Sequence, residues 1–178
     1  QTFQELYYGG AYELANKIGQ FILETYNMAL AENLLDEGDI QFFTQRLSQI
    51  HYSLGMIKLK KGDYNNARQN FYTAVSKYVK NYGPPLYRIK SRIAECYFKN
   101  KDYSKALKHY RNNYYDTSWD SNWKYAELSM LALSEFRAGQ IDSAKIHFNL
   151  VEKKYHDIDH DDGTIYYYTD WPLYLYYD

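Results

Sequence analysis

The sequence predicts an all-α protein in which antiparallel helix hairpins stack into an α-solenoid. Three observations lead to this fold class. A short motif recurs four times along the 178 residues, and repetition of this length is typical of helical arrays. Apolar residues between the copies recur at steps of three and four, which places them on one helix face. Proline is scarce, at 3 residues, which favours uninterrupted helices.

In each copy of the motif, a turn residue precedes a large apolar residue, and a small residue follows three positions later. The large residues are Tyr12, Tyr64, Tyr103 and Ile141, and the small residues are Ala15, Ala67, Ala106 and Ala144. The large residues are 52, 39 and 38 positions apart, and the last two spacings are regular enough to mark repeat units. Each unit therefore predicts two helices, A and B, which are joined by a tight turn at the motif.

The second unit shows the pattern most fully. Helix A is predicted from about Phe42 to Lys61, and helix B from Tyr64 to about Tyr78. Gly62 makes the turn between them and Asp63 is a good N-cap for helix B. Gly55 lies in the apolar stripe of helix A, where its missing side chain would allow helix B to approach closely.

The third and fourth units repeat this arrangement with shorter helices. The third predicts helix A over about Leu86 to Phe98 and helix B over Tyr103 to Tyr110. The fourth predicts helix A from about Trp123 to Ala138 and helix B from Ile141 to Tyr155. Many of the 23 tyrosines fall in these helices, where a tyrosine fills a wide seam and keeps its hydroxyl in water.

Small and aromatic residues also alternate at fixed distances from the motif. The small residues nine positions before the large motif residue are Gly55, Ala94 and Ala132, and the aromatic residues seven positions after it are Phe71, Tyr110 and Phe148. This alternation resembles the tetratricopeptide repeat (TPR) over about residues 48–155. The resemblance implies a right-handed superhelical stack in which the A helices line an inner groove. Units of 38 or 39 residues are longer than the ~34 of the family, and the extra residues fall in inter-repeat loops.

We expect one TPR-like region over residues 1–178. Its units are residues 1–34 (partial), 42–80, 85–115, 123–156 and 164–178 (a partial next repeat or a cap). Both ends read as interrupted repeats, which favours a segment of a longer protein over a complete chain with short caps.

Composition excludes several classes of function. The net charge of −1 argues against general nucleic-acid binding, which needs a basic surface. No apolar run approaches the ~20 residues that span a bilayer. No nucleophile elbow, phosphate loop or metal motif is present, so the sequence predicts no enzyme and no cofactor. Cys96 is expected to be a small buried apolar residue.

One acidic cluster has the start of a calcium-loop spacing. Asp157, Asp159 and Asp161 alternate along the chain, but the glycine of such a loop is one position late at Gly163. The twelfth position, where a glutamate belongs, is Tyr168. We therefore favour a solvated loop that ends helix B over a metal site.

The positions that line the groove in the resembling family define the candidate binding site. They are Tyr52, Met56, Lys60, Arg88, Arg92, Lys99, Met130 and Arg137. Basic residues at the centre with adaptable apolar neighbours suit an acidic protein or peptide. The predicted function is non-enzymatic protein or peptide binding. Two alternatives stay open, a sensory or regulatory solenoid within a longer signalling protein and a structural spacer.

Two further features carry open interpretations. The aromatic C-terminal segment, residues 165–177, either packs on the last repeat or forms a patch for self-association. His109 and His147 occupy equivalent places, six residues after the large motif residue, and are expected on the surface. His51 is expected to be a partly buried packing residue.

Overall fold

The computed structural model describes residues 11–116 and 121–158, with side chains at residues 11–116 and 124–153. The described residues form seven α-helices, and the β-type pairing among them is one isolated bridge between Val79 and Tyr82. The chain divides into two compact units, Gln1–Cys96 and Tyr97–Asp178, and the boundary falls inside the helix of residues Leu86–Lys99. No helix in the described ranges is both long and apolar enough to cross a membrane.

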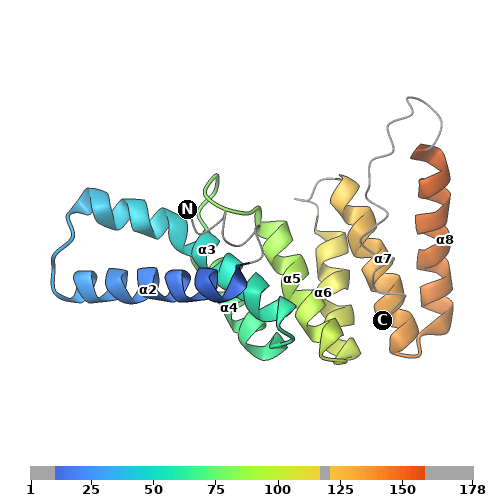
Figure 1. The fold of residues 1–178 in the computed structure, drawn as a ribbon. Helices are drawn as coiled ribbons and strands as arrows, with labels where there is room; N and C mark the ends of the chain where they lie inside the picture. The colour runs from blue at the N-terminus through green and yellow to red at the C-terminus, as the bar shows by residue number, and fades with distance from the viewer. Residues whose placement is uncertain (1–10, 117–120, 159–178) are drawn as a thin grey trace. The chain divides into compact units, whose positions relative to one another are not determined.

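The first unit contains α2 (Tyr12–Ala31), α3 (Glu37–Lys60), α4 (Tyr64–Ser76) and most of α5 (Leu86–Lys99). Helices α2 and α3 lie antiparallel, and α4 packs along the C-terminal half of α3 (Figure 1). Because α4 is only 13 residues long, it does not reach the N-terminal half of α3. That half pairs with the C-terminal half of α2 as a two-helix hairpin.

The second unit contains the last turn of α5, α6 (Tyr103–Tyr115), α7 (Ser121–Arg137) and α8 (Ile141–Ile158). Helix α7 packs against α6 on one side and α8 on the other. The four B helices α2, α4, α6 and α8 begin at the large residues of the motif, as predicted. The motif therefore marks the point at which the chain turns from helix A into helix B.

The turns that follow four of the described helices share one hydrogen-bond pattern. After α3, the N–H of Asp63 donates to the carbonyl of Lys58 at 2.9 Å, and that of Gly62 donates to the carbonyl of Leu59 at 3.1 Å. This pair of bonds is the Schellman motif, which needs one left-handed residue. The same pair follows α2, α5 and α7, with left-handed φ angles of 54°, 61° and 80° at Asn33, Lys101 and Gly139.

Acidic side chains begin three of the helices. Asp63 accepts a hydrogen bond from the N–H of Asn66 at 3.4 Å, and Asp102 accepts one from Lys105 at 3.3 Å, which confirms the expected N-cap at Asp63. Asp36 accepts one from Asp39 at 2.7 Å. This third cap starts α3 at Glu37, so the prediction that helix A begins near Phe42 was wrong by about one turn.

The α3–α4 hairpin is held together by a glycine and an aromatic ring. Phe71 on α4 is fully buried, and a Cβ added at Gly55 would lie 2.6 Å from Phe71 Cε1. The glycine is therefore required by close helix approach, as its place in the apolar stripe predicts. Nearby, Ser48 donates to the carbonyl of Ala74 at 2.8 Å, which satisfies a buried hydroxyl across the same seam.

The core of the second unit centres on α7. Every residue from 127 to 135 is buried, so this helix is enclosed on all sides and not on one stripe alone. Leu131 and Ala132 are fully buried on α7, and Tyr110 and Ala144 are buried on the neighbouring α6 and α8. The enclosed stretch also contains two glutamates, whose partners are described below.

Candidate functional site

The structure brings together two of the predicted groove residues of the first unit, Tyr52 on α3 and Arg92 on α5. Both side chains are half-buried, and a side-chain hydrogen bond joins them. The ring of Tyr52 also packs on Phe71, with ring centroids 5.7 Å apart. The core of the α3–α4 hairpin therefore positions Tyr52, and Tyr52 in turn helps to position Arg92.

Arg92 keeps its charge within a partly enclosed setting. Its Nη1 lies 2.5 Å from Glu95 Oε2, one turn further along α5. Burial acts to lower the pKa of Arg92, but attraction to Glu95 and Tyr52 and the hydrogen bonds to both outweigh it, so the pKa is raised. Glu95 therefore offsets much of the positive charge that the sequence places at this point.

The remaining groove residues of the first unit differ in how freely they meet solvent. Met56 and Arg88 are half-buried on α3 and α5. Lys60 is exposed at the end of α3, where its Nζ donates to Tyr12 Oη at 3.0 Å and lies 5.2 Å from the Tyr12 ring centroid. Lys60 therefore links α3 to α2 in this conformation.

The predicted groove residues of the second unit differ in burial, since two of the side chains reach the surface and one lies in the interior. Lys99 is half-buried in the last turn of α5, and Arg137 is exposed in the last turn of α7. Met130 is only 1% exposed and lies in the enclosed stretch of α7. The expectation that Met130 offers a surface contact is therefore corrected, because its side chain packs in the interior.

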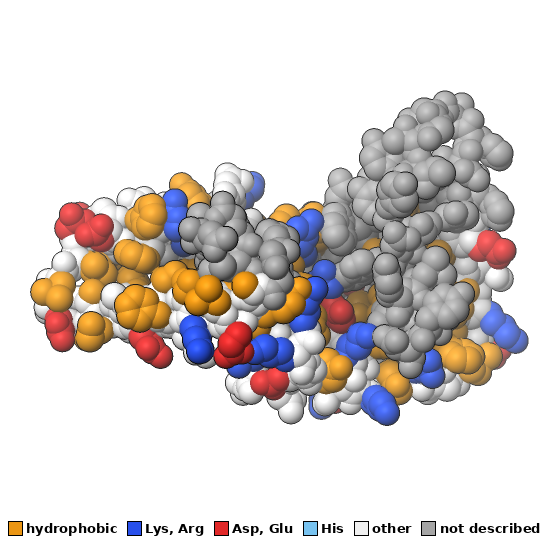
Figure 2. Space-filling model, viewed as in Figure 1, with side chains coloured by type: hydrophobic (Ala, Val, Ile, Leu, Met, Phe, Trp, Pro, Cys, Tyr) orange, Lys and Arg blue, Asp and Glu red, His pale blue; other side chains and the backbone are white. Residues whose placement is uncertain are grey.

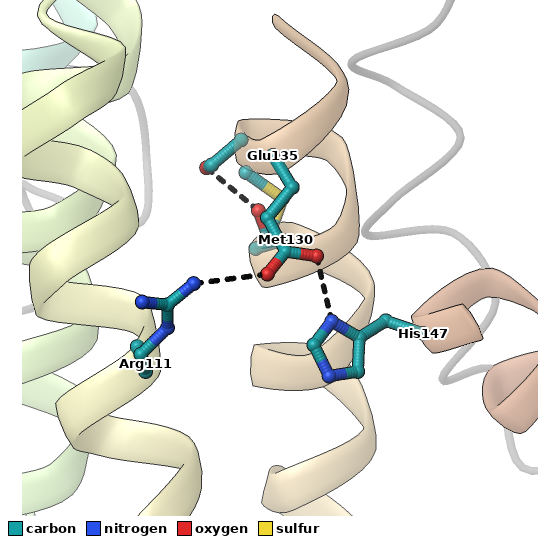
Figure 3. A network of polar contacts seen from close by, with 5 residues as sticks. Arg111, Met130, Glu135 and His147 are labelled. Carbon is teal, nitrogen blue, oxygen red and sulfur yellow. Dashed lines mark hydrogen bonds and ion pairs between the residues drawn. The ribbon is translucent and has the colours of Figure 1, made fainter. Parts of the chain in front are cut away.

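A buried polar network, which the sequence pattern did not indicate, joins α6, α7 and α8 in the second unit. Glu135 on α7 is fully buried, and its two carboxylate oxygens have different partners (Figure 3). Arg111 Nη2 on α6 lies 3.2 Å from Oε1, and His147 Nδ1 on α8 lies 2.6 Å from Oε2. One carboxylate thus ties three successive helices together.

A second buried carboxylate lies two turns earlier on the same helix. Glu127 Oε2 accepts a hydrogen bond from Asn113 Nδ2 at 3.0 Å, and both side chains are buried. Glu127 and Glu135 are eight residues apart, so they lie near one face of α7. This spacing is the one sequence feature that could have pointed to the two buried glutamates. It does not distinguish them from glutamates on a solvent-exposed helix face, which have the same spacing.

The two equivalent histidines follow one contact rule. Each histidine lies six positions after the large motif residue of its hairpin. Each contacts the residue that lies six positions before that motif residue, on the A helix of the same hairpin. His109 stacks on Tyr97 with ring centroids 5.1 Å apart, and His147 meets Glu135. Both histidines are half-buried, so the expectation of surface histidines is corrected.

The remaining candidates for chemistry have structural roles. Cys96 is fully buried, as expected, and burial together with Glu95 raises the pKa of its thiol to about 12. His51 is half-buried, as predicted, with Nδ1 3.4 Å from Asn70 Oδ1. Among the described side chains, no three His, Cys, Asp or Glu residues come together as a metal site. The acidic cluster Asp157, Asp159 and Asp161 and the aromatic segment lie outside the described side chains.

Comparison with known proteins agrees with this fold. A family model described as the tetratricopeptide repeat matches residues 48–76, which span the close Gly55–Phe71 contact. A crystal structure of nearly identical TPR-like repeats, from a Podosopora anserina protein described as a putative kinesin light chain, superposes with a TM-score of 0.65. The match covers 89% of this chain and 74% of the other chain, at 12% sequence identity. At this identity the similarity shows that the two chains share a fold. No curated protein sequence matches the chain.

The hairpins, the close A–B contact and the comparisons lead to the same assignment. The predicted all-α fold of the α-solenoid class is confirmed. Folds of this kind generally serve as scaffolds for protein interaction. The chain is a tetratricopeptide-like helical repeat protein.

Proposed function

We propose that the protein is a non-enzymatic scaffold that binds an acidic peptide on the A-helix face of its first unit. The observation that carries this proposal is the contact between Tyr52 and Arg92, because it joins two predicted groove positions from successive A helices. Met56 and Arg88 belong to the same set and are half-buried, so parts of both side chains remain open to a ligand.

The chemistry of this face suits a mixed ligand. A tyrosine ring and a thioether provide apolar contact of adaptable shape, and a guanidinium recognises a carboxylate through paired hydrogen bonds. Arg88 lies one turn before Arg92 on α5 and offers a second guanidinium to an acidic side chain of the ligand. A short peptide that combines Glu residues with an aliphatic or aromatic residue fits both properties.

Charge reversal tests the proposal, and Arg88 is the better position for it. Reversal at Arg92 would set a second carboxylate beside Glu95 and destabilise the helix whatever its function. The test uses fluorescence anisotropy with labelled twelve-residue peptides of three kinds: Glu-rich with aromatic residues, Lys-rich, and neutral. We expect the Glu-rich peptides to bind and Arg88→Glu to weaken binding by about tenfold or more, with the protein still folded at the assay temperature.

Lys80→Glu is the matched control, because it makes the same charge change at an exposed position of this unit outside the A helices. It should leave the affinity within about twofold of wild type. Equal weakening by both variants would reduce the effect to general charge attraction and contradict a site on the A helices. Failure of every peptide to bind would favour the structural-spacer interpretation.

A further inference from the structure

Helix α2 carries a row of large apolar residues on its solvent face. Leu14, Phe21 and Met28 are 49%, 66% and 58% exposed, although each is a residue type that is usually buried. They are seven residues apart, and seven residues make almost two full turns, so the three side chains form a straight stripe ~21 Å long. Figure 2 shows apolar side chains gathered over α2 and the first half of α3.

The part of the fold beneath this stripe is thin. Between residues 20 and 46, Tyr26 is the one buried side chain, held by a ring contact of 5.2 Å with Phe43. A hairpin of two helices buries little apolar surface when no third layer covers it. Phe21 and Met28 therefore lie on the least covered region of the first unit, and Leu14 lies at its edge.

The charges beside the stripe make it complementary to itself. Lys17 follows Leu14 by three residues and Glu24 follows Phe21 by three, so both flank the stripe on the same side. Both are exposed. Glu13, a further acid on the solvent side of α2, already pairs with Lys61. Lys17 and Glu24 therefore determine which partner the stripe accepts.

We propose that the stripe is the interface of a homodimer, in which α2 pairs with α2 of a second copy in antiparallel orientation around a two-fold axis at Phe21. In this arrangement, the residue n positions before Phe21 in one copy faces the residue n positions after Phe21 in the other copy. Phe21 meets its own equivalent, and Leu14 meets Met28. The apolar stripe is thus matched along its whole length.

The same symmetry pairs the charges. Lys17 lies four positions before Phe21 and Glu24 lies three after it, so in the dimer they are one residue, or ~1.5 Å along the axis, from direct opposition. A two-fold axis normal to the plane of the two helices keeps the same flank of each helix together, and the pair forms twice. A parallel pairing, whose two-fold axis runs along the helices, would instead put the charged flanks of the two copies on opposite sides of the seam, so Lys17 and Glu24 would form no pair.

Sedimentation equilibrium of the 178-residue chain, from about 1 µM to about 100 µM, tests this dimer. We expect a concentration-dependent dimer that Phe21→Glu weakens by at least about 100-fold, because the new carboxylates meet on the two-fold axis in an apolar seam. Ile146→Glu is the matched control, since Ile146 is 60% exposed on α8 and lies outside the stripe. It should leave dimerisation unchanged, while a monomer at every wild-type concentration would overturn the proposal.

Charge swapping tests the orientation separately. Lys17→Glu and Glu24→Lys should each weaken the dimer by about tenfold, and the double variant should restore it, because both copies then carry the swapped pair. A dimer that ignores Phe21→Glu would overturn the stripe as its interface. A double variant as weak as either single variant would overturn the antiparallel pairing.

Discussion

The α3–α4 hairpin and the α7–α8 hairpin use the same turn but hold their helices together with different chemistry. In the first, the ring of Phe71 lies against Gly55, and the seam is mainly apolar. In the second, Ala132 takes the position of Gly55, and a buried carboxylate at Glu135 reaches His147. The repeat thus determines how closely the helices approach, while each hairpin has its own contact.

The difference has an energetic consequence. An apolar seam is destabilised when the fit changes, because there is no space for added atoms. A buried carboxylate is destabilised when its partners are lost, because the charge is then left without compensation. The two hairpins should therefore be sensitive to different kinds of substitution, and the following predictions are ordered from the largest expected effect on stability to the smallest.

Removing both partners of Glu135 should have the largest effect. The double variant Arg111→Ala/His147→Ala leaves the carboxylate buried and unpaired, and we expect a loss of about 3–5 kcal/mol of unfolding free energy. Chemical denaturation followed by circular dichroism measures the change. Adding Glu135→Met to this variant should recover most of the loss, because no buried charge then remains. A triple variant no more stable than the double would show that packing, and not charge, dominates the seam.

Filling the glycine seam should have an intermediate effect. Gly55→Ala places a methyl group against the buried ring of Phe71, and we expect a net loss of about 1–2 kcal/mol after the gain in helix propensity. The same denaturation experiment measures it. Phe71→Leu should reduce the free energy of unfolding less in the Gly55→Ala background than in the wild-type protein. If Gly55→Ala is neutral or stabilising, the close approach of α3 and α4 is not a constraint.

Titration of His51 should have the smallest effect of the three. Burial lowers the pKa of His51, with Lys77 acting in the same direction and the hydrogen bond to Asn70 opposing both. The unfolded chain therefore binds a proton more readily, and His51 should reduce stability as the pH falls through its ordinary pKa of 6.5. His51→Gln should shrink the difference in melting temperature between pH 7.5 and pH 5.5. An unchanged difference would assign the pH dependence to other groups.

The repeat arrangement was predictable because its signals are local. The motif predicted the first residue of all four B helices, and for α4, α6 and α8 a left-handed turn residue lies two positions before that residue. Gly55 was predictable for a similar reason, because a glycine within the apolar stripe of a helix marks a point where a second helix can come close. The start of α3 was missed because Asp36 lies inside an acidic stretch that reads as loop.

The contacts of α7 were not predictable from periodicity. A sequence pattern does not distinguish a glutamate on the solvent face of a helix from one in the core. The burial of Glu127 and Glu135 was therefore not predicted. Met130 was assigned to the surface because a groove position was carried over from the family pattern. Helix α7 is enclosed on every side between residues 127 and 135. The family pattern assumes that each A helix has an exposed face, so it does not apply to this stretch.

The shared turn also shows how repeats that differ in sequence can make the same change of chain direction. Each turn specifies one backbone torsion angle, and the residues that adopt it are Asn33, Gly62, Lys101 and Gly139. Glycine, asparagine and lysine all adopt this angle here, so the turn restricts the backbone and leaves the side chain open. The path of the chain from one helix to the next is therefore set at these four residues by a single torsion angle.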